Sequence, residues 1–404
     1  MKEVPYTTLQ TLLGPGSVER DPRGLARAVP EDEAALALVC RTAHEEGWKI
    51  RLEGRATWLP ADAPADLALS TRGLDGVVSV SPADLVATVR AGTPLEALRR
   101  QLADHGMWLA LDPPGRPDRS IGSVVATATS GPLRQAYGPV RDQVLGCTVV
   151  TGDGRRVKAG GRVVKNVAGY DLTKLQVGGF GGFGVISELH LRLRALPRAD
   201  MTLIARDGRD VLTGAARAAA AAQIGCSTLE LLSPALAADS EWVLAARFTG
   251  NEVTVQSEGR RLQGETALTW QQLPVERSGA FWSMAARAAL GGVITVRLGA
   301  LTDGLDESID LLIDTLDEGL ISAGAGAGAI RWSGSAEPDR LRHLRRQAAG
   351  REIPMTIERA PWALRRLLGH FGAYREGVGQ LVGRLRESFD PSQCLSVALE
   401  GSEE

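Results

Sequence analysis

Residues 162–186 read RVVKNVAGYDLTKLQVGGFGGFGVI, and they indicate more about the fold than any other part of the chain. Five glycines lie between Gly178 and Gly184, directly before an apolar segment. Glycine permits positive φ angles and lets the backbone approach a ligand closely. Backbone N–H groups exposed in this way bind anions such as phosphate. The stretch therefore predicts a loop wrapped on a phosphorylated cofactor, with a flexible turn between two elements as the alternative.

The residues on either side of this loop predict an antiparallel sheet. Leucines at alternate positions between 189 and 193 have the period of a half-buried strand, and Pro197 ends it. Upstream, a turn signal at 151–154 joins two apolar segments, which is typical of a hairpin. We expect the hairpin and the strand after the glycine loop to share one sheet.

Length and composition narrow the class of protein. The 404 residues are enough for two or three domains, and 44% apolar residues supply their cores. A net charge of −2 gives no indication of a nucleic-acid partner. The four cysteines are too far apart for a CxxC zinc or iron–sulfur site. No segment has the ~18 apolar residues of a transmembrane helix, and the N-terminus lacks an apolar signal segment. We expect a cytoplasmic protein, with peripheral attachment to the inner membrane through partners left open.

The first 130 residues indicate alternating helices and strands. Residues 31–47 predict an amphipathic helix, residues 48–52 a strand, and residues 53–57 a turn at the strand end, where ligands gather in such units. Residues 93–96 predict a capping box with proline at the first helical position. Residues 121–130 are small and apolar, and predict a helix that packs closely against a flat group.

The composition changes after Pro197. Ala-rich and Leu-rich helical segments alternate with short predicted strands as far as residue 375, which indicates a second α/β domain. The low-complexity run at 323–329 is interpreted as a loop rather than a phosphate site, because no capped helix follows it.

In combination, these motifs resemble a known family. The motif at 163–172, the glycine loop and Gly184-Val-Ile186 are similar to the FAD-binding E subunit of bacterial glycolate oxidases, within the vanillyl-alcohol oxidase or PCMH-type superfamily. The resemblance covers about residues 30–197. It implies an α+β protein with a two-subdomain PCMH-type FAD-binding domain at 1–197 and an α/β cap domain at 198–375. A C-terminal segment at 376–404 is expected to return to the FAD domain.

The resemblance also implies which residues contact FAD. They lie in a first loop, a segment along the cofactor chain, a segment near the flavin, and a closing loop: Gly54, Arg55, Ala56, Thr57, Asp112, Pro113, Ser120, Ile121, Gly122, Ser123, Thr127, Ser130, Lys165, Gly181, Gly182, Gly184, Val185 and Ile186. Lys165 is expected to place a positive charge near the cofactor, with Arg134 and Arg162 as rivals for that role.

Three features depart from the superfamily. The first loop has one glycine where three are usual, Phe180 stands where an acidic residue is common, and the Asn-Pro-Gly that often follows Asp390-Pro391 is missing. The first loop also lacks histidine, so we predict FAD held without a covalent bond.

The sequence assigns no catalytic base and no metal site. Oxidation of a 2-hydroxy acid needs a base for the hydroxyl and a flavin for the hydride. His44, His105 and His190 are interpreted as structural, and no paired histidines are visible.

Three functions remain open from the sequence. The first is an FAD-binding subunit of a complex that oxidises glycolate or another small 2-hydroxy acid, with a D-type flavoprotein and an iron–sulfur subunit as partners. The second is a free-standing FAD-dependent D-2-hydroxy acid dehydrogenase. The third is a cofactor-free structural subunit of the same complex.

Overall fold

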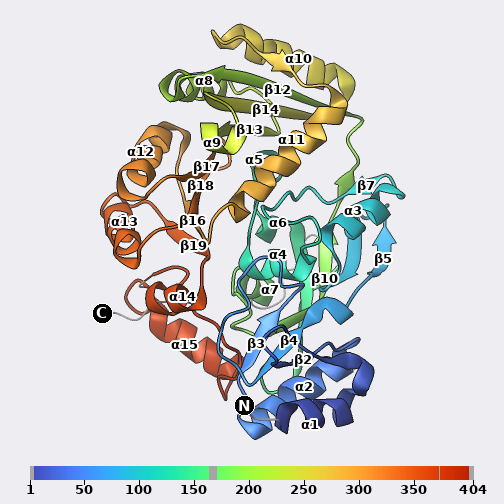
Figure 1. Ribbon diagram of the computed structural model, residues 1–404. Coiled ribbons are helices and arrows are strands. Elements are labelled where there is room, and N and C mark those ends of the chain that lie inside the picture. The colour runs from blue at the N-terminus through green and yellow to red at the C-terminus, as the bar shows by residue number, and fades with distance from the viewer. Residues whose placement is uncertain (1–3, 163–170, 373, 400–404) are drawn as a thin grey trace.

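The computed structural model describes residues 4–162, 171–372 and 374–399 (Figure 1). The N-terminal helices and two small sheets lie at one end of the molecule, and a large sheet with its helices lies at the other. The helices and short 3-10 turns (η) run as follows: α1 Val4–Leu13, η1 Pro15–Ser17, α2 Glu33–Glu46, η2 Thr71–Gly73, α3 Leu95–Ala103, α4 Ile121–Thr127, α5 Arg134–Tyr137, α6 Val140–Gln143, α7 Leu172–Gln176, α8 Arg209–Ala221, α9 Pro234–Ala237, α10 Glu252–Glu265, α11 Val275–Arg287, η3 Ala288–Leu290, η4 Thr302–Gly304, α12 Leu305–Thr315, α13 Pro338–Gly350, α14 Trp362–Leu368 and α15 Val378–Phe389.

The first sheet has the order β1-β2-β4-β3, and β3 and β4 are parallel. Its strands are β1 Val18–Arg20, β2 Ala26–Ala28, β3 Ile50–Glu53 and β4 Leu67–Ser70. Helix α2 packs on it through a buried stripe that includes Leu36 and Val39. The Asp32 carboxylate accepts a hydrogen bond from Ala35 N at 2.8 Å, and Gly47 ends the helix with φ 66.

The second sheet is antiparallel and has the order β5-β6-β10-β8-β9. Its strands are β5 Val77–Ser81, β6 Val86–Arg90, β8 Val144–Val150, β9 Arg156–Gly160 and β10 Val185–Arg192. The predicted hairpin is therefore β8–β9, and the strand after the glycine loop is β10, which pairs with β8. Helix α4 packs against this sheet and brings its small residues into the interior.

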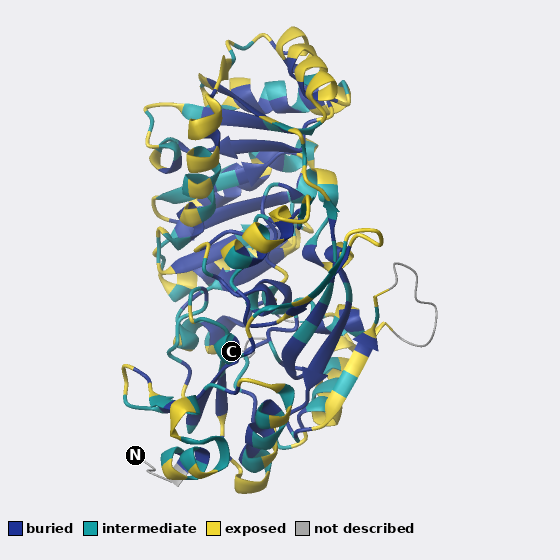
Figure 2. Cartoon of the chain, turned by 90° about the vertical axis from the view of Figure 1, so that its right-hand side faces the viewer, coloured by how far each residue is buried: buried dark blue, intermediate teal, exposed yellow. Residues whose placement is uncertain are grey.

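The third sheet has eight antiparallel strands in the order β15-β12-β14-β13-β17-β18-β16-β19. Its strands are β12 Ala199–Asp207, β13 Thr228–Leu232, β14 Trp242–Gly250, β15 Gln271–Gln272, β16 Ile294–Leu298, β17 Gly319–Gly324, β18 Ala329–Gly334 and β19 Met355–Arg359. A two-stranded pair, β7 Met107–Trp108 with β11 Arg194–Ala195, lies just before it in the chain. Figure 2 shows the strands of the large sheet buried behind helices whose outer faces are exposed.

The C-terminal segment returns to the first sheet. Ile50 N donates to Cys394 O at 2.7 Å, and Ser396 N donates to Ile50 O at 2.9 Å. Cys394 and Leu395 are buried in the same apolar cluster as α2. Residues far apart in the sequence thus meet beside β3.

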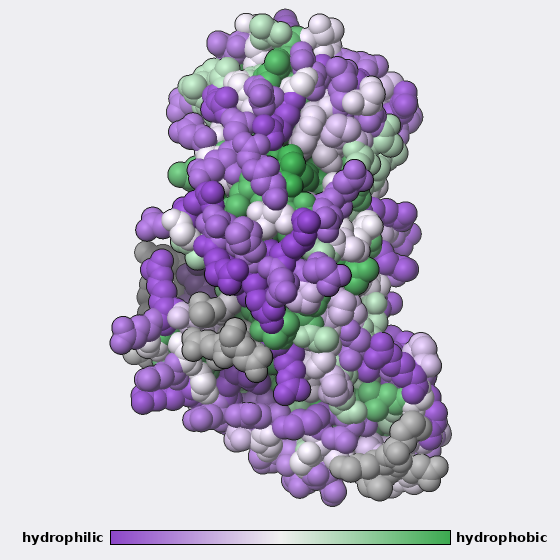
Figure 3. Space-filling model, turned by 60° about the vertical axis from the view of Figure 1, so that its left-hand side comes forward, coloured by the Kyte–Doolittle hydropathy of each residue, from purple (hydrophilic) through white to green (hydrophobic). Residues whose placement is uncertain are grey.

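The surface in Figure 3 is mostly polar, with small apolar areas between charged side chains. Among the helices that the structure describes, none is long and apolar enough to cross a membrane. The four cysteines are unpaired and buried.

The start of α3 differs from the sequence prediction. Pro94 is the residue that precedes the helix, and the Thr93 hydroxyl donates to Arg90 O at 2.7 Å instead of capping α3. The predicted capping box is wrong because Thr93 Oγ1 accepts a hydrogen bond from Gly76 N at 2.9 Å and none from an N–H of the first helical turn.

Gly92 provides a test of the packing that joins β6 to η2. A Cβ at this position would lie 2.0 Å from Thr71 O and 2.7 Å from Leu74 O, and both atoms belong to the backbone. We expect Gly92→Ala to lower the free energy of unfolding by at least about 3 kcal/mol. Gly214→Ala is the control, because a Cβ on that helical glycine would meet no atom within 4 Å. Its free energy of unfolding should rise by up to about 1 kcal/mol, because alanine is favoured over glycine inside a helix. Equal urea midpoints for both variants would contradict the predicted contact.

Candidate cofactor-binding site

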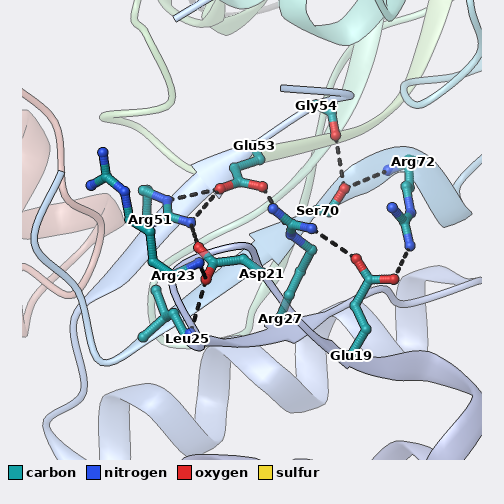
Figure 4. Close-up of polar contacts among 10 residues, drawn as sticks. All are labelled: Glu19, Asp21, Arg23, Leu25, Arg27, Arg51, Glu53, Gly54, Ser70 and Arg72. Atoms are coloured by element: carbon teal, nitrogen blue, oxygen red, sulfur yellow. Dashed lines mark hydrogen bonds and ion pairs between the residues drawn. The ribbon is translucent and has the colours of Figure 1, made fainter. Parts of the chain in front are cut away.

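A buried network of ion pairs holds the end of β3, where the first predicted loop begins (Figure 4). Arg51 pairs with Asp21 at 2.5 Å and with Glu53 at 2.7 Å. Arg27 bridges Glu53 at 3.1 Å and Glu19 at 2.8 Å. Buried charges are tolerated in proteins when each has an oppositely charged partner. These pairs between arginines and carboxylates therefore anchor β3 to the N-terminal strands.

Gly54 follows β3 and contacts the start of α4. Its carbonyl accepts a hydrogen bond from the Ser70 hydroxyl at 2.8 Å. A Cβ at Gly54 would lie 2.4 Å from Ser120 Oγ and 3.3 Å from Ser123 Cβ. Glycine therefore lets this loop lie directly against α4 without a shift of the Ser120 or Ser123 side chain.

The loop after Gly54 presents free backbone donors. Ala56 has φ 53, the left-handed conformation that glycine adopts most easily. Within the described part of the chain, the N–H groups of Arg55, Ala56 and Thr57 have no hydrogen-bond acceptor. Successive N–H groups around a left-handed residue form an anion-binding concavity. Ala56 thus adopts a left-handed conformation without being glycine.

The glycine-rich loop approaches from the other side. Gly181 has φ 83, and a Cβ there would lie 2.6 Å from Leu52 Cδ1. Gly184 has φ 115 and lies against Val150 O. Both positions favour glycine because of their positive φ angles and because a Cβ would be too close to a neighbouring atom. The contact of Gly181 with Leu52 shows that this loop lies beside β3.

These segments enclose a cavity of about 130 Å³, called here the first cavity. The predicted FAD-contacting residues that line it are Gly54, Ala56, Thr57, Gly122, Ser123, Thr127, Gly181, Gly184, Val185 and Ile186. They come from three separate parts of the chain. Ser396, Val397 and Ala398 of the C-terminal segment complete the wall.

Other predicted residues lie outside that wall. Arg55 points away, with Nε donating to Gly92 O at 3.0 Å and Nη2 pairing with Asp75 at 2.7 Å. Gly182 packs against Val397 and Leu399. Lys165 lies outside the described residues.

Ser120, Ile121 and Ser130 have different surroundings. Ser120 is buried beside Gly54, and no partner for its Oγ occurs among the described residues. Ile121 belongs to the apolar core under the second sheet. The Ser130 hydroxyl accepts from Val140 N at 3.3 Å, so it stabilises the turn after α4.

Asp112 and Pro113 line a second cavity of about 430 Å³, between the turn at 131–133 and the large sheet. Both carboxylate oxygens of Asp112 accept from Leu133 N at 3.1 Å. Burial raises the pKa of Asp112 to about 6. Asp112 therefore stabilises the wall of this cavity, which also contains Arg247 and Arg331.

Arg134 and Arg162, the alternatives to Lys165 as the positive charge near the cofactor, have different surroundings. Arg134 is half-buried on α5, and its pKa is lowered by burial and by the nearby Arg297 and Arg331. Arg162 is exposed.

His370 is a wall residue of the first cavity that the sequence did not single out. Its ring stacks on Phe180 with centroids 3.7 Å apart, and Nδ1 lies 2.8 Å from Ile357 O. Burial lowers the pKa of His370 to about 4, so the ring is neutral at pH 7 and Nδ1 carries the proton that bonds to Ile357. A lone histidine after α14 has no sequence pattern that would reveal this position.

The residues present fit FAD. The free N–H groups at 55–57 and the unpartnered Ser120 Oγ suit a diphosphate, and the small residues of α4 suit a flat ring. The first cavity alone is smaller than the ~300 Å³ of a typical ligand pocket. Trp58 of its wall lies beside Gly115 of the second cavity, where a Cβ on Gly115 would be 3.2 Å from the Trp58 ring.

Comparisons with known proteins identify an FAD-binding domain in this chain. A family model for the FAD binding domain matches residues 25–160. The fold matches alkyldihydroxyacetonephosphate synthase with a TM-score of 0.74 at 12% identity, over 98% of this chain and 84% of that one. It matches 4-ethylphenol oxidase from Gulosibacter chungangensis with a TM-score of 0.74 at 13% identity, over 98% and 97% of the two chains. At these identities the structures establish the fold alone.

Curated relatives are closer in sequence. The chain is 32% identical over 286 residues to the glycolate oxidase subunit GlcE of Escherichia coli strain K12, which covers 70% of this chain and 75% of that protein. It is 33% identical over 195 residues to D-2-hydroxyglutarate dehydrogenase of Xanthomonas citri pv. viticola, covering 47% of this chain and 41% of that enzyme.

Fold and site together define an FAD-dependent oxidoreductase of the PCMH type, and its cofactor is FAD. This confirms the α+β fold class with a PCMH-type FAD-binding domain. Within that class, the chain belongs to the family of the glycolate oxidase subunit GlcE.

Gly54 tests the contact between the first loop and α4. We expect Gly54→Ala to reduce the affinity for FAD at least tenfold, because its Cβ would push the loop away from Ser120. Ala56→Gly should retain FAD, since glycine adopts the same left-handed conformation. Gly264→Ala is the control, because a Cβ on this glycine of α10 would meet no atom within 4 Å and the residue lines neither cavity. Fluorescence titration with FAD gives the affinities, and unchanged binding by Gly54→Ala would contradict the proposed contact.

His370 predicts a pH dependence of stability. Its folded-state pKa of about 4 lies below the ordinary value of 6.5. Between these values the unfolded chain binds a proton that the folded chain does not, so stability falls as pH falls. Lowering the pH from 7 to 5 should therefore lower the free energy of unfolding by about 2 kcal/mol through this histidine. His370→Asn keeps an N–H donor for Ile357 and should lose that part of the pH dependence in urea unfolding. His343→Asn, at an exposed position, should not, and equal pH profiles for wild type and His370→Asn would refute the assignment.

Proposed function

We propose that this chain is the FAD-binding subunit of a complex that oxidises glycolate or another small 2-hydroxy acid and passes the electrons to partner subunits. The observation that carries the proposal is the first cavity, where the loop at 54–57, α4 and the glycine-rich loop converge. The similarity to the E. coli glycolate oxidase subunit GlcE supports the substrate and the complex.

The proposed chemistry divides between the cofactor and this chain. Bound FAD accepts the hydride that leaves the carbon bearing the hydroxyl group. The residues Gly54, Ala56, Thr57, Ser120, Ser123, Gly181 and Gly184 would hold the cofactor without a covalent bond. The second cavity, with Arg247 and Arg331 in its wall, suits a small carboxylate.

The proposed partners are a D-type flavoprotein and an iron–sulfur subunit. A second relative is named as subunit GlcD of glycolate oxidase from Bacillus subtilis, at 31% identity over 41% of this chain and 36% of that protein. The four cysteines of this chain are buried at separate places, so we assign the iron–sulfur clusters to a partner. We place the complex in the cytoplasm, with any membrane attachment made by the partners.

We also propose three units in the chain: an FAD-binding domain at 1–197, a cap domain at 198–375, and a C-terminal segment at 376–404. The large sheet begins with β12 at Ala199, and the hydrogen bonds between Ile50 and the segment at 394–396 support the return of the C-terminus.

A second candidate function is a free-standing FAD-dependent D-2-hydroxy acid dehydrogenase. The match to D-2-hydroxyglutarate dehydrogenase favours it, although the chain spans less than half of that enzyme. A free-standing enzyme also needs a base for the hydroxyl group, and the pKa of His370 in the wall of the first cavity is too low for an efficient one. The described residues contain no cluster of three metal-ligating side chains.

An absorbance spectrum of the purified chain tests the proposal. We expect flavin bands near ~370 and ~450 nm, released by acid, in the chain alone or with a D-type partner. Bleaching by glycolate only in the presence of the partner would favour the subunit over the free-standing enzyme. A protein that stays colourless with added FAD would refute both and favour the cofactor-free structural subunit.

A further inference from the structure

Residues 58–63, called here the cover loop, form one side of the first cavity. The cover-loop residues in the cavity wall are Trp58, Leu59, Pro60, Ala61 and Ala63. Trp58 and Ala63 are buried, with 3% and 5% of their surfaces exposed. The loop continues directly from residues 55–57, whose N–H groups have no acceptor among the described residues. Its position therefore affects both the enclosure of the cavity and the direction of these donors.

The cover loop is held by residues about 300 positions later in the chain. Arg359 Nε, at the end of β19, donates to Trp58 O at 3.1 Å. Trp362 N donates to Asp62 Oδ2 at 2.6 Å, and Arg365 Nη2 donates to Asp62 Oδ1 at 2.9 Å. Within the part of the chain that the structure describes, the hydrogen bonds of the cover loop all come from these three residues.

The surroundings of Arg365 make its ion pair with Asp62 strong. Arg365 is 5% exposed and lines the first cavity. Its Nε donates to Ala360 O at 2.8 Å, which fixes the guanidinium on α14, and Nη2 also donates to Pro60 O at 3.3 Å. The Asp62 side chain is 21% exposed, so water has little access to the pair. Breaking such a pair leaves a buried charge without its partner, which is far more costly than breaking an exposed pair.

Toward the N-terminal half of the chain, the cover loop makes packing contacts. The Trp58 ring lies 4.3 Å from Arg119 Cζ, and Leu59 packs against the cluster that contains Phe180 and Phe183. Apolar packing is non-directional, so it does not fix the path of a backbone. The hydrogen bonds from Arg359 and from α14 therefore determine where the cover loop lies.

We infer that Asp62 and Arg365 are positioning residues for FAD, whose ion pair holds the cover loop over the bound cofactor and limits how fast FAD leaves. This inference rests on the proposed FAD site. The first cavity lies between the cover loop on one side and α4 with the glycine-rich loop on the other. Helix α4 packs into the core under the second sheet, whereas the cover loop depends on a few hydrogen bonds. Segments with few fixed contacts open locally at the lowest cost in free energy, so the cover loop is the wall that opens.

The test measures how fast FAD leaves the loaded chain, with a partner present if loading needs the partner. Asp62→Ala removes both acceptors and the charge, and Asp62→Asn keeps an acceptor for Trp362 N without the charge. The control Asp239→Ala breaks the ion pair of Asp239 with Arg206 at 2.6 Å, in which the aspartate side chain is 23% exposed. Neither residue of the control pair lines either cavity. The FAD that remains bound is measured by absorbance after dilution and gel filtration at timed intervals.

We expect Asp62→Ala to raise the dissociation rate of FAD at least about tenfold, and Asp62→Asn to give a rate between that of Asp62→Ala and that of the wild type. Asp239→Ala should keep the wild-type rate. Asp62→Ala combined with Arg365→Met should dissociate no faster than Arg365→Met alone, because both substitutions break the same pair. If Asp62→Ala does not fold in urea-unfolding experiments, Asp62→Asn still decides.

A second measurement reports on the cover loop without FAD. Thermolysin cleaves before leucine, and cleavage at Leu59 in the apoprotein requires the loop to open. We expect cleavage at this position to be faster in Asp62→Ala than in the wild type or in Asp239→Ala, because proteolysis follows the population of the open form.

Two results would overturn the inference and leave the proposed function intact. One is a folded Asp62→Ala variant that loses FAD no faster than Asp239→Ala, which would assign the pair to stability alone. The other is faster loss of FAD with unchanged cleavage at Leu59, which would place the effect outside the cover loop. A wild-type chain that binds no FAD, with or without a partner, would instead refute the proposed function and this inference together.

Discussion

The contact between Gly54 and Ser120 is the constraint on which the cofactor site depends. Atoms of β3, β4 and α4 meet there with no room for a Cβ, so the first loop and the helix share one wall. The N–H groups of residues 55–57, in the loop that follows, have no acceptor among the residues that the structure describes. The cavity then forms where the glycine-rich loop, which also lacks side chains at Gly181 and Gly184, lies against the same strand.

Buried charge serves two purposes in this protein. Around β3, each arginine of the network contacts at least one carboxylate, and the network anchors the strand that carries Gly54 (Figure 4). On the large sheet, Arg331 pairs with Glu358 and also donates to Ser130 O at 2.6 Å, which links the large sheet to the turn after α4. Because Ser130 follows α4 and Arg331 lines the second cavity, this bond joins the walls of the two cavities.

Local patterns predicted the parts of the site that depend on backbone conformation. The glycines at 181 and 184 adopt positive φ, and the alternating leucines form the buried face of β10. Contacts of long side chains were harder to predict. Arg55 stands in the right loop, yet its guanidinium reaches Asp75, which follows η2. Asp112 stands in a matching motif, yet it bonds to Leu133 and lines the second cavity. Such directions depend on partners that sequence spacing does not reveal.

The sequence by itself indicated the family through the resemblance of its motifs. It also predicted the hairpin and the strand that follows the glycine-rich loop, because glycine conformations and strand periodicity are local properties of the chain. It could not show that Ala56 adopts the left-handed conformation usually left to glycine. Nor could it show that Trp58, His370 and the segment at 396–398 line one cavity. Only the tertiary structure decided these points, because they arise where segments up to about 340 residues apart are brought together. Burial, which the sequence does not reveal, is the largest cause of the lowered pKa of His370.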